Sequence, residues 1–341
     1  MTAGIESVES ARISVETREA VRRFIRTGSI FLALAILWTG LAFASPYFFT
    51  QQNILNILLQ SSTVGILAAG VTVVLIAGEI DISVASVQAL AATVAATVII
   101  THGGSVVLGI AAGIAVAILC GSVNGYVTIY ARVPSFIVTL AMLGIAQGAA
   151  FLVTGGQAIG EFPRAYTVIG QGKVGPIPVP VIIAGGVYLL LHLLLAQTAF
   201  GVNIYAIGGS RNASRLVGLR VERTIMAVFV LCGALAGLSG LILSARLDAA
   251  HGSFGASDLL DAIAAVVIGG TSLFGGSGTV VGTLGGVIII STIRNGLVLL
   301  NVEAFWTQVV VGVVILAAVM LDQVFKGELA FRDLVPGLRH G

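Results

Sequence analysis

Two carboxylates, Glu79 and Asp81, are the only formally charged side chains between residues 28 and 131. An acid within so long an apolar stretch normally faces a cavity, a partner or the edge of the apolar phase, because burying it alone is costly. Three roles fit the pair. Asp81 can cap the helix that begins at Ile82 and Ser83, it can close a gate by meeting a base of the other half of the protein or of the loop 198–224, or the two acids can carry protons together.

The sequence contains no pattern of residues that is typical of a catalytic site. The four histidines are scattered without metal-ligand spacing, and there is no Cys/His cluster, pair of catalytic acids or activated nucleophile. A phosphate-binding loop needs Gly-x-x-x-x-Gly-Lys-Ser/Thr before a helix. Residues 170–174 (GQGKV) lack that spacing and the hydroxyl. We therefore predict no catalytic residue, no metal site and no ATP hydrolysis by this chain.

The composition is that of a membrane protein. Hydrophobic residues make up 57% of the 341 residues and charged residues 9%, and the mean hydropathy is +1.07. A soluble domain would carry roughly a quarter charged residues. The net charge of +2 is too small to indicate nucleic-acid binding, and Cys120 and Cys232 lie in apolar segments, where inert thiols are expected.

The run 261–322 is intensely apolar, yet it is interrupted by GGTSLFGGSG (269–278) and by Arg294 and Asn295. A bilayer offers no water to unpaired backbone groups, so such a break persists only where protein or a water-filled path surrounds it. Broken apolar spans are typical of transport pathways. A similar glycine break at 78–83 precedes a small-residue span and an Asn-Gly pair, which makes the two breaks candidate counterparts, although close helix packing also favours glycine.

Spans of about 20 apolar residues, the length needed to cross a bilayer, predict an all-α, polytopic transmembrane bundle. About ten spans are expected, at 28–48, 54–77, 83–101, 105–128, 135–154, 179–197, 225–246, 258–273, 279–300 and 305–322. With both termini in the cytoplasm, thirteen of the seventeen Lys and Arg residues fall on the cytoplasmic side, as the positive-inside rule requires.

The predicted organisation is a cytoplasmic N-terminal segment (1–27), a transmembrane domain (28–323) and a cytoplasmic tail (324–341). The N-terminal segment is either an interfacial helix or a charged tail. Residues 155–178 contain three prolines and form an external loop that cannot be one helix.

Residues 198–224, which we call the coupling segment, form the most informative cytoplasmic loop. The chain turns at Gly208 and Gly209, Ser210 caps a short helix, and Gly218 ends that helix. One interpretation is a basic retention loop that would suit any membrane protein. The other is a short helix that inserts into a cleft of a soluble partner and carries motion into the membrane.

Five ordered motifs across residues 50–323 resemble the permease subunits of ATP-binding-cassette importers, in particular the ribose-type branch that serves monosaccharides. They are 78–84 (GEIDISV), 132–140 (RVPSFIVTL) with 152–156 (LVTGG), 206–218 (AIGGSRNASRLVG), 261–273 (DAIAAVVIGGTSL) and 295–297 (NGL). A related branch handles branched-chain amino acids. The sequence departs from the resemblance at Glu79, where glycine is usual, and at Leu259, where a glutamate is common.

The resemblance implies a bacterial inner-membrane pore made by two permease subunits, identical or closely related. It also implies a separate ATPase that binds ATP and Mg, so that this chain needs no cofactor, and a periplasmic or lipid-anchored sugar-binding protein. Contact with the ATPase is expected from Gly208, Gly209, Ser210, Arg211, Ala213, Arg215 and Gly218. Gate or pathway residues are expected to be Glu79, Asp81, Ser83, Asn124, Gln147, Asp261, Thr271, Ser272 and Asn295.

A sugar path should use hydroxyl and amide groups that bind weakly, because a permease that holds its substrate tightly cannot release it. Polar side chains of this kind within spans are Ser61, Ser62, Gln88, Asn124, Gln147, Asn295 and Gln308. Each is as well explained by a helix–helix hydrogen bond. An ion-coupled secondary transporter that acts alone is the alternative function, and it would use Glu79 or Asp81 for coupling. An intramembrane enzyme is disfavoured because no reactive set is present.

Overall fold

The structure is a computed structural model that describes residue 28 and residues 30–326 of the chain. The predicted N-terminal segment 1–27 and most of the predicted tail, 327–341, lie outside the described residues.

Apolar helices dominate the first half of the described chain. After the helix Ile30–Ala44 come α2 (Gln51–Ile76), α3 (Val84–Ala96) with a π-helical end η1 (Thr97–Thr101), α4 (Val106–Tyr130) and α5 (Ser135–Thr154). Thr50 begins α2 by accepting a hydrogen bond from the Asn53 backbone N–H, and Ser105 begins α4 in the same way. These side chains satisfy backbone donors that the first helical turn leaves without a partner.

Short elements separate the two halves, and long helices then resume. The segment 155–178, predicted to be an external loop, contains β1 (Ile159–Gly160), α6 (Arg164–Gln171), β2 (Lys173–Val174) and β3 (Ile177–Pro178). The second half contains α7 (Val179–Gln197), α8 (Ala199–Gly209), α9 (Arg211–Leu216), α10 (Val221–Leu247), β4 (Ala249–Ala250), α11 (Asp258–Ile268), α12 (Val280–Leu299) and α13 (Ala304–Lys326). The expectation that 155–178 is not a single helix is confirmed.

Seven helices among the described residues are long and apolar enough to cross a membrane, and three shorter apolar helices accompany them. The predicted spans 135–154 and 179–197 coincide with α5 and α7. The span predicted over 258–273 is wrong in length, because α11 ends at Ile268. Gly270 there has a φ of +82°, a conformation that turns the chain out of the helix.

Helices α2, α3, α10 and α12 form the centre of the bundle, whereas α4, α5 and α7 expose most of their apolar surface. Glycine lets the central helices approach closely. A Cβ at Gly240 of α10 would lie 2.1 Å from the Gln88 carbonyl oxygen of α3, and one at Gly121 of α4 would lie 2.3 Å from that of Phe229. Such small-residue packing is typical of membrane helices.

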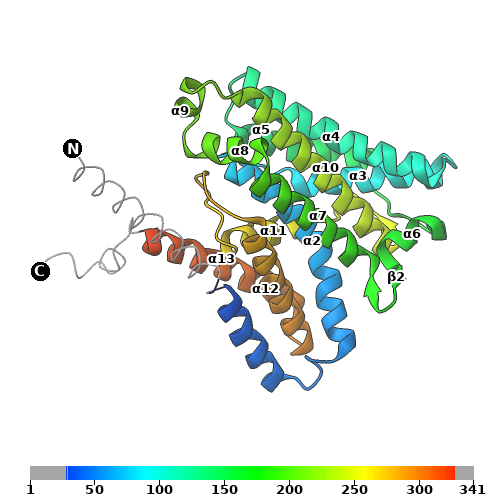
Figure 1. The fold of residues 1–341 in the computed structure, drawn as a ribbon. Helices are drawn as coiled ribbons and strands as arrows, with labels where there is room; N and C mark the ends of the chain where they lie inside the picture. Colours follow the sequence, from blue (N-terminus) through cyan, green and yellow to red (C-terminus); the bar gives the residue numbers. More distant parts are fainter. Residues whose placement is uncertain (1–27, 29, 327–341) are drawn as a thin grey trace, which may run out of the picture.

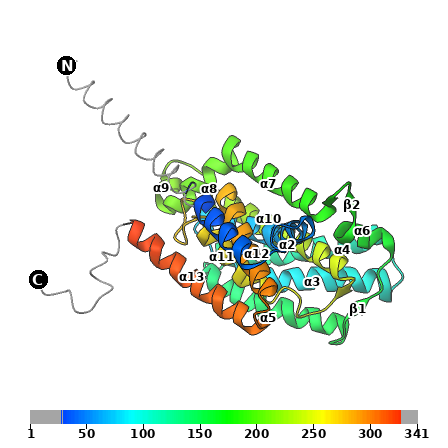
Figure 2. The ribbon, with the colours of Figure 1, turned by 90° about the horizontal axis from the view of Figure 1, so that it is seen from below.

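The bundle has two distinct ends. In Figures 1 and 2, α8 and α9 lie at the same end as the C-terminal part of α13, while α6 and β2 lie at the opposite end. At the α6 end, β1 pairs with β4 in antiparallel register, so the external loop is joined to the chain that follows α10.

Candidate functional site

The coupling segment folds as two helices joined at a corner. Ser210 ends α8 and begins α9, where its hydroxyl accepts a hydrogen bond of 3.3 Å from the Ala213 backbone N–H. Gly218 follows α9 with a φ of +82°. The predicted short helix with a serine cap and a glycine stop is therefore confirmed. The predicted turn at Gly208 and Gly209 is wrong, because both residues lie in the last turn of α8 and the chain turns at Ser210.

The exposed part of α9 is apolar at its end. Leu216 and Val217 are 89% and 76% exposed, whereas Ser214 is buried against the bundle. Arg215 forms an ion pair with Glu222 at 2.9 Å, and both side chains are about half exposed. An apolar tip beside basic residues, at one end of a membrane bundle, is suited to contact with a soluble protein.

The two glycine breaks meet beneath the coupling segment. A Cβ at Gly275 would lie 2.7 Å from the Cα of Gly78 and 2.8 Å from the carbonyl oxygen of Gly208. A Cβ at Gly208 would lie 1.8 Å from the Ile76 carbonyl oxygen and 2.6 Å from the backbone nitrogen of Gly276. We call Gly78, Gly208, Gly275 and Gly276 the glycine junction. Only residues without a side chain permit this approach of three backbone segments.

Two hydrogen bonds join the same segments. The Gly276 N–H donates to the Ile76 carbonyl at 2.9 Å, which links the second break to the end of α2. The Tyr205 hydroxyl of α8 donates to the Gly278 carbonyl at 2.8 Å. The 269–278 break is therefore bonded directly to α8 and to the end of α2.

Arg211 of α9 forms an ion pair with Glu79 of the 78–83 break. The Glu79 side chain is 5% exposed and that of Arg211 is 41% exposed. Burial lowers the pKa of the Arg211 guanidinium, and the neighbouring Arg215 acts in the same direction, but an arginine stays charged in proteins. The hypothesis of an acid that meets a base of the coupling loop thus finds its geometry in Glu79 rather than in Asp81.

Asp81 lies in a separate hydrogen-bonded cluster. Its Oδ1 accepts from the Ser83 backbone N–H at 2.9 Å and from the Ser83 hydroxyl at 2.6 Å, and the Asn124 amide donates to Ser83 Oγ at 3.0 Å. This geometry ties the start of α3 to α4. The prediction that Asp81 caps this helix is wrong, because α3 begins at Val84 and its N-cap residue is Ser83. The Asp81 carboxylate instead holds Ser83 in place.

The other predicted gate or pathway residues lie elsewhere. Asp261 of α11 is bound by Arg294 of α12 through contacts of 2.7 and 2.8 Å, and Asn295 exchanges amide hydrogen bonds of 2.7 and 3.0 Å with Asn53. Thr271 and Ser272 are buried in the turn of the second break. The predicted set is therefore divided among several places in the bundle rather than gathered in one site.

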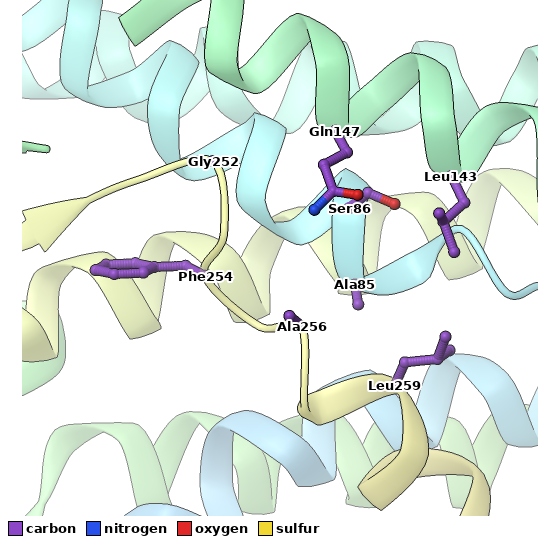
Figure 3. Close-up of a pocket in the computed structure, with 8 residues that line it drawn as sticks. All are labelled: Ala85, Ser86, Leu143, Gln147, Gly252, Phe254, Ala256 and Leu259. Carbon is purple, nitrogen blue, oxygen red and sulfur yellow. The ribbon is translucent and has the colours of Figure 1, made fainter. Parts of the chain in front are cut away.

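Gln147 lies at a cavity of about 160 Å³ between α3, α5 and the chain that leads into α11 (Figure 3). The cavity is lined by Ala85, Ser86, Leu143, Gln147, Gly252, Phe254, Ala256 and Leu259. The Gln147 and Ser86 side chains both line this cavity (Figure 3). Sequence reasoning missed Tyr205, Asn53, Phe254 and Asp258, because each has its role through a partner that is distant in the chain.

Metal binding has no structural basis in the described part of the chain, where no group of three or more His, Cys, Asp or Glu residues is placed to hold an ion. The arrangement provides instead a short surface helix, two glycine breaks that contact the coupling segment, and a small, mostly apolar cavity.

Comparison with known proteins gives a consistent result. Residues 53–319 match the family described as the permease component of branched-chain amino acid transport systems. The chain is 40% identical over 295 residues to the ribose import permease protein RbsC of Escherichia coli K12, covering 85% of this chain and 92% of that protein. It is 41% identical over 295 residues to RbsC of Bacillus subtilis 168, covering 86% and 91%. It is 35% identical over 322 residues to the L-arabinose ABC transporter permease protein AraH of Azospirillum brasilense, covering 94% and 95%. No solved structure matches the chain.

Proposed function

The chain belongs to the family of permease components of branched-chain amino acid transport systems, and we propose that it is the pore-forming subunit of an ATP-binding-cassette importer for a monosaccharide. The relatives named above are permeases for ribose and arabinose, which supports a sugar rather than an amino acid as the substrate. The aligned region covers most of this chain and most of each relative. This supports assigning the relatives' whole role to this chain, as a multi-pass protein of the bacterial inner membrane.

Energy for transport comes from a separate ATPase in this proposal. The observation that carries the proposal is the coupling segment, whose apolar tip at Leu216 and Val217 is exposed and whose Gly208, in the last turn of α8, touches both breaks. ATP and Mg bind to the partner, so this chain contributes no cofactor site. A sugar-binding protein delivers the solute at the opposite end of the bundle.

The mechanism is alternating access in a pair of permease subunits, either two copies of this chain or this chain with a close relative. ATP binding closes the ATPases and moves α9 with them. Because α8 and α9 contact the glycine junction and Glu79, the breaks at 78–83 and 269–278 rearrange and change which side of the membrane the path faces. ATP hydrolysis returns the subunits to the starting state.

The orientation that fits this mechanism has both termini in the cytoplasm and ten crossings. The ten crossings are the seven long helices, the helix Ile30–Ala44, α13 and one crossing made of residues 251–268, which is the eighth in chain order. Helix α11 alone is about 16 Å long, roughly half of the hydrocarbon core, so the irregular segment before it supplies the rest. Arg211, Arg215 and Lys326 then share the cytoplasmic side.

Purification of the tagged chain from its native membrane in mild detergent, followed by mass spectrometry, tests the proposal. A stoichiometric ATPase that stays bound supports the importer. A chain that purifies alone, and that transports in proteoliposomes under an ion gradient, supports the alternative of a secondary transporter coupled through Glu79 or Asp81.

A further inference from the structure

The cavity beside Gln147 is built from three parts of the chain that are distant in sequence. Ser86 lies on α3, Gln147 on α5, and Phe254 on the segment 251–257, which returns from β4 into the bundle before α11 (Figure 3). Its volume of about 160 Å³ is several times the roughly 30 Å³ that one water occupies in the liquid. The cavity therefore suits a small solute rather than a single bridging water.

Gln88 holds the wall of this cavity in place. Its side chain is fully buried, and its amide donates to Asp258 Oδ2 at 3.1 Å and to Ser239 Oγ at 3.4 Å. Gly255 has a φ of +75°, and a Cβ there would lie 2.5 Å from Gln88 Oε1. The segment 251–257 is thus fitted closely against α3, and the Asp258 carboxylate beside it is already engaged.

The lining suits a neutral solute that has both hydroxyl groups and an apolar face. All eight lining residues are uncharged, and two of them, Gln147 and Ser86, carry polar side chains. A primary amide offers two donors and an acceptor, and a hydroxyl offers one donor and two lone pairs. Ser86 uses its donor on the Ser83 carbonyl at 3.2 Å, which leaves its oxygen to accept. Leu143 and Leu259 provide apolar surface (Figure 3).

We propose that this cavity is a transient binding site for the transported solute, a neutral monosaccharide, with Gln147 as its specificity-determining residue. This inference rests on the proposed function and deepens it. The Gln147 amide and the Ser86 oxygen bind ring hydroxyls, while Leu143 and Leu259 pack against the C–H face of the ring. Two polar contacts hold a sugar weakly, which suits a site that has to release it.

Protection of a reporter thiol by sugar tests the site. Both native cysteines are buried, at 7% and 1% exposure, so an introduced thiol is labelled over a low background. Ala256 lines the cavity and is exposed, which makes Ala256→Cys the reporter, and exposed Gln157 on the external loop gives the control Gln157→Cys. The full transport complex is labelled with a small maleimide in the presence of D-ribose, L-arabinose or L-leucine.

We expect D-ribose or L-arabinose to slow labelling of Ala256→Cys and to leave Gln157→Cys unchanged. Addition of Gln147→Leu to the reporter should raise the sugar concentration for half-protection about fivefold, the effect of losing one neutral hydrogen bond. Protection by L-leucine alone, or no protection while the wild-type complex imports sugar, overturns the site and leaves the importer intact. A wild-type complex that imports neither sugar overturns the proposed function and the site together.

Discussion

Arg211 of α9 is paired with the buried carboxylate of Glu79, in the loop between α2 and α3. This pair joins the surface helix at one end of the bundle directly to a broken transmembrane element. Together with the glycine junction, it provides a short physical route from a docking surface to the membrane interior.

Loss of the Glu79 charge should weaken coupling. Glu79→Gln leaves Arg211 without its buried partner, and we expect ATP-driven uptake to fall about tenfold, which corresponds to roughly 1.4 kcal/mol. The control Glu222→Gln breaks only the exposed pair with Arg215 and should change uptake by less than about fivefold, because exposed ion pairs typically contribute no more than about 1 kcal/mol. Equal effects of the two substitutions would show that the buried pair has no special role.

Charge reversal extends this test. Arg211→Glu combined with Arg215→Glu should abolish uptake while the protein remains folded in the membrane, because the basic face of α9 and its pair with Glu79 are both lost. Arg211→Glu alone should be partly rescued by Glu79→Arg, since the swapped pair restores the attraction. Normal transport by the double α9 variant, measured with its membrane abundance, would contradict the coupling role.

Two adjacent glycines provide a matched pair of substitutions. Gly208→Ala places a Cβ 1.8 Å from the Ile76 carbonyl oxygen, whereas Gly209→Ala has no atom within 4 Å of its Cβ. We expect the transport complex that contains Gly208→Ala to hydrolyse ATP without moving sugar, because the end of α8 no longer fits against the breaks. Gly209→Ala should keep wild-type uptake per ATP hydrolysed. The ratio of sugar uptake to phosphate release, measured for both variants, tests whether Gly208 is needed to couple ATP hydrolysis to transport.

The apolar tip of α9 should bind the ATPase. Leu216→Glu introduces a charge where a buried contact is expected, and loss of an interface anchor worth about 2 kcal/mol weakens binding roughly thirtyfold. Leu152→Glu is the control, because Leu152 is similarly exposed, at 84%, but lies at the end of α5 that leads into the external loop. The amount of ATPase retained per permease after washing should fall for Leu216→Glu alone. Retention by both variants would place the docking surface elsewhere.

The pair of Asp261 with Arg294 should contribute to stability rather than to coupling. Arg294→Met leaves a buried carboxylate without its partner, and we expect a loss of about 3 kcal/mol in the free energy of unfolding. Arg294→Met together with Asp261→Asn should recover most of that loss, because no charge remains buried. Thermal unfolding in detergent measures both, and an unstable double variant alongside a stable single variant would refute the explanation.

Features set by local chemistry could be predicted from the sequence. Hydropathy located α5 and α7, and the capping chemistry of Ser210 with the stop at Gly218 located α9. The length of α11 could not be predicted, because apolar composition continues beyond Ile268 while the helix does not. When a short helix is followed by a turn of apolar and small residues, the hydropathy of the whole stretch is the same as that of a full transmembrane span.

The contacts between residues that are distant in the chain were the main part of the site that could not be predicted from the sequence. Gly78, Gly208 and Gly275 meet at one point. In the sequence, however, a glycine that lets a neighbouring backbone approach closely cannot be distinguished from a glycine that ends a helix. Glu79 was recognisable as unusual, whereas its pairing with Arg211 depends on how α9 lies against the bundle. Asp81 and Glu79, close in sequence and considered as a pair, prove to belong to separate sets of contacts.

Sugar uptake into proteoliposomes that contain the purified chain with its co-purified ATPase tests the central claim most directly. We predict uptake of D-ribose or L-arabinose that requires ATP on the α9 side and the sugar-binding protein on the other, and that an ionophore leaves unchanged. Uptake by the chain alone that collapses with the ionophore and does not depend on ATP would contradict the account.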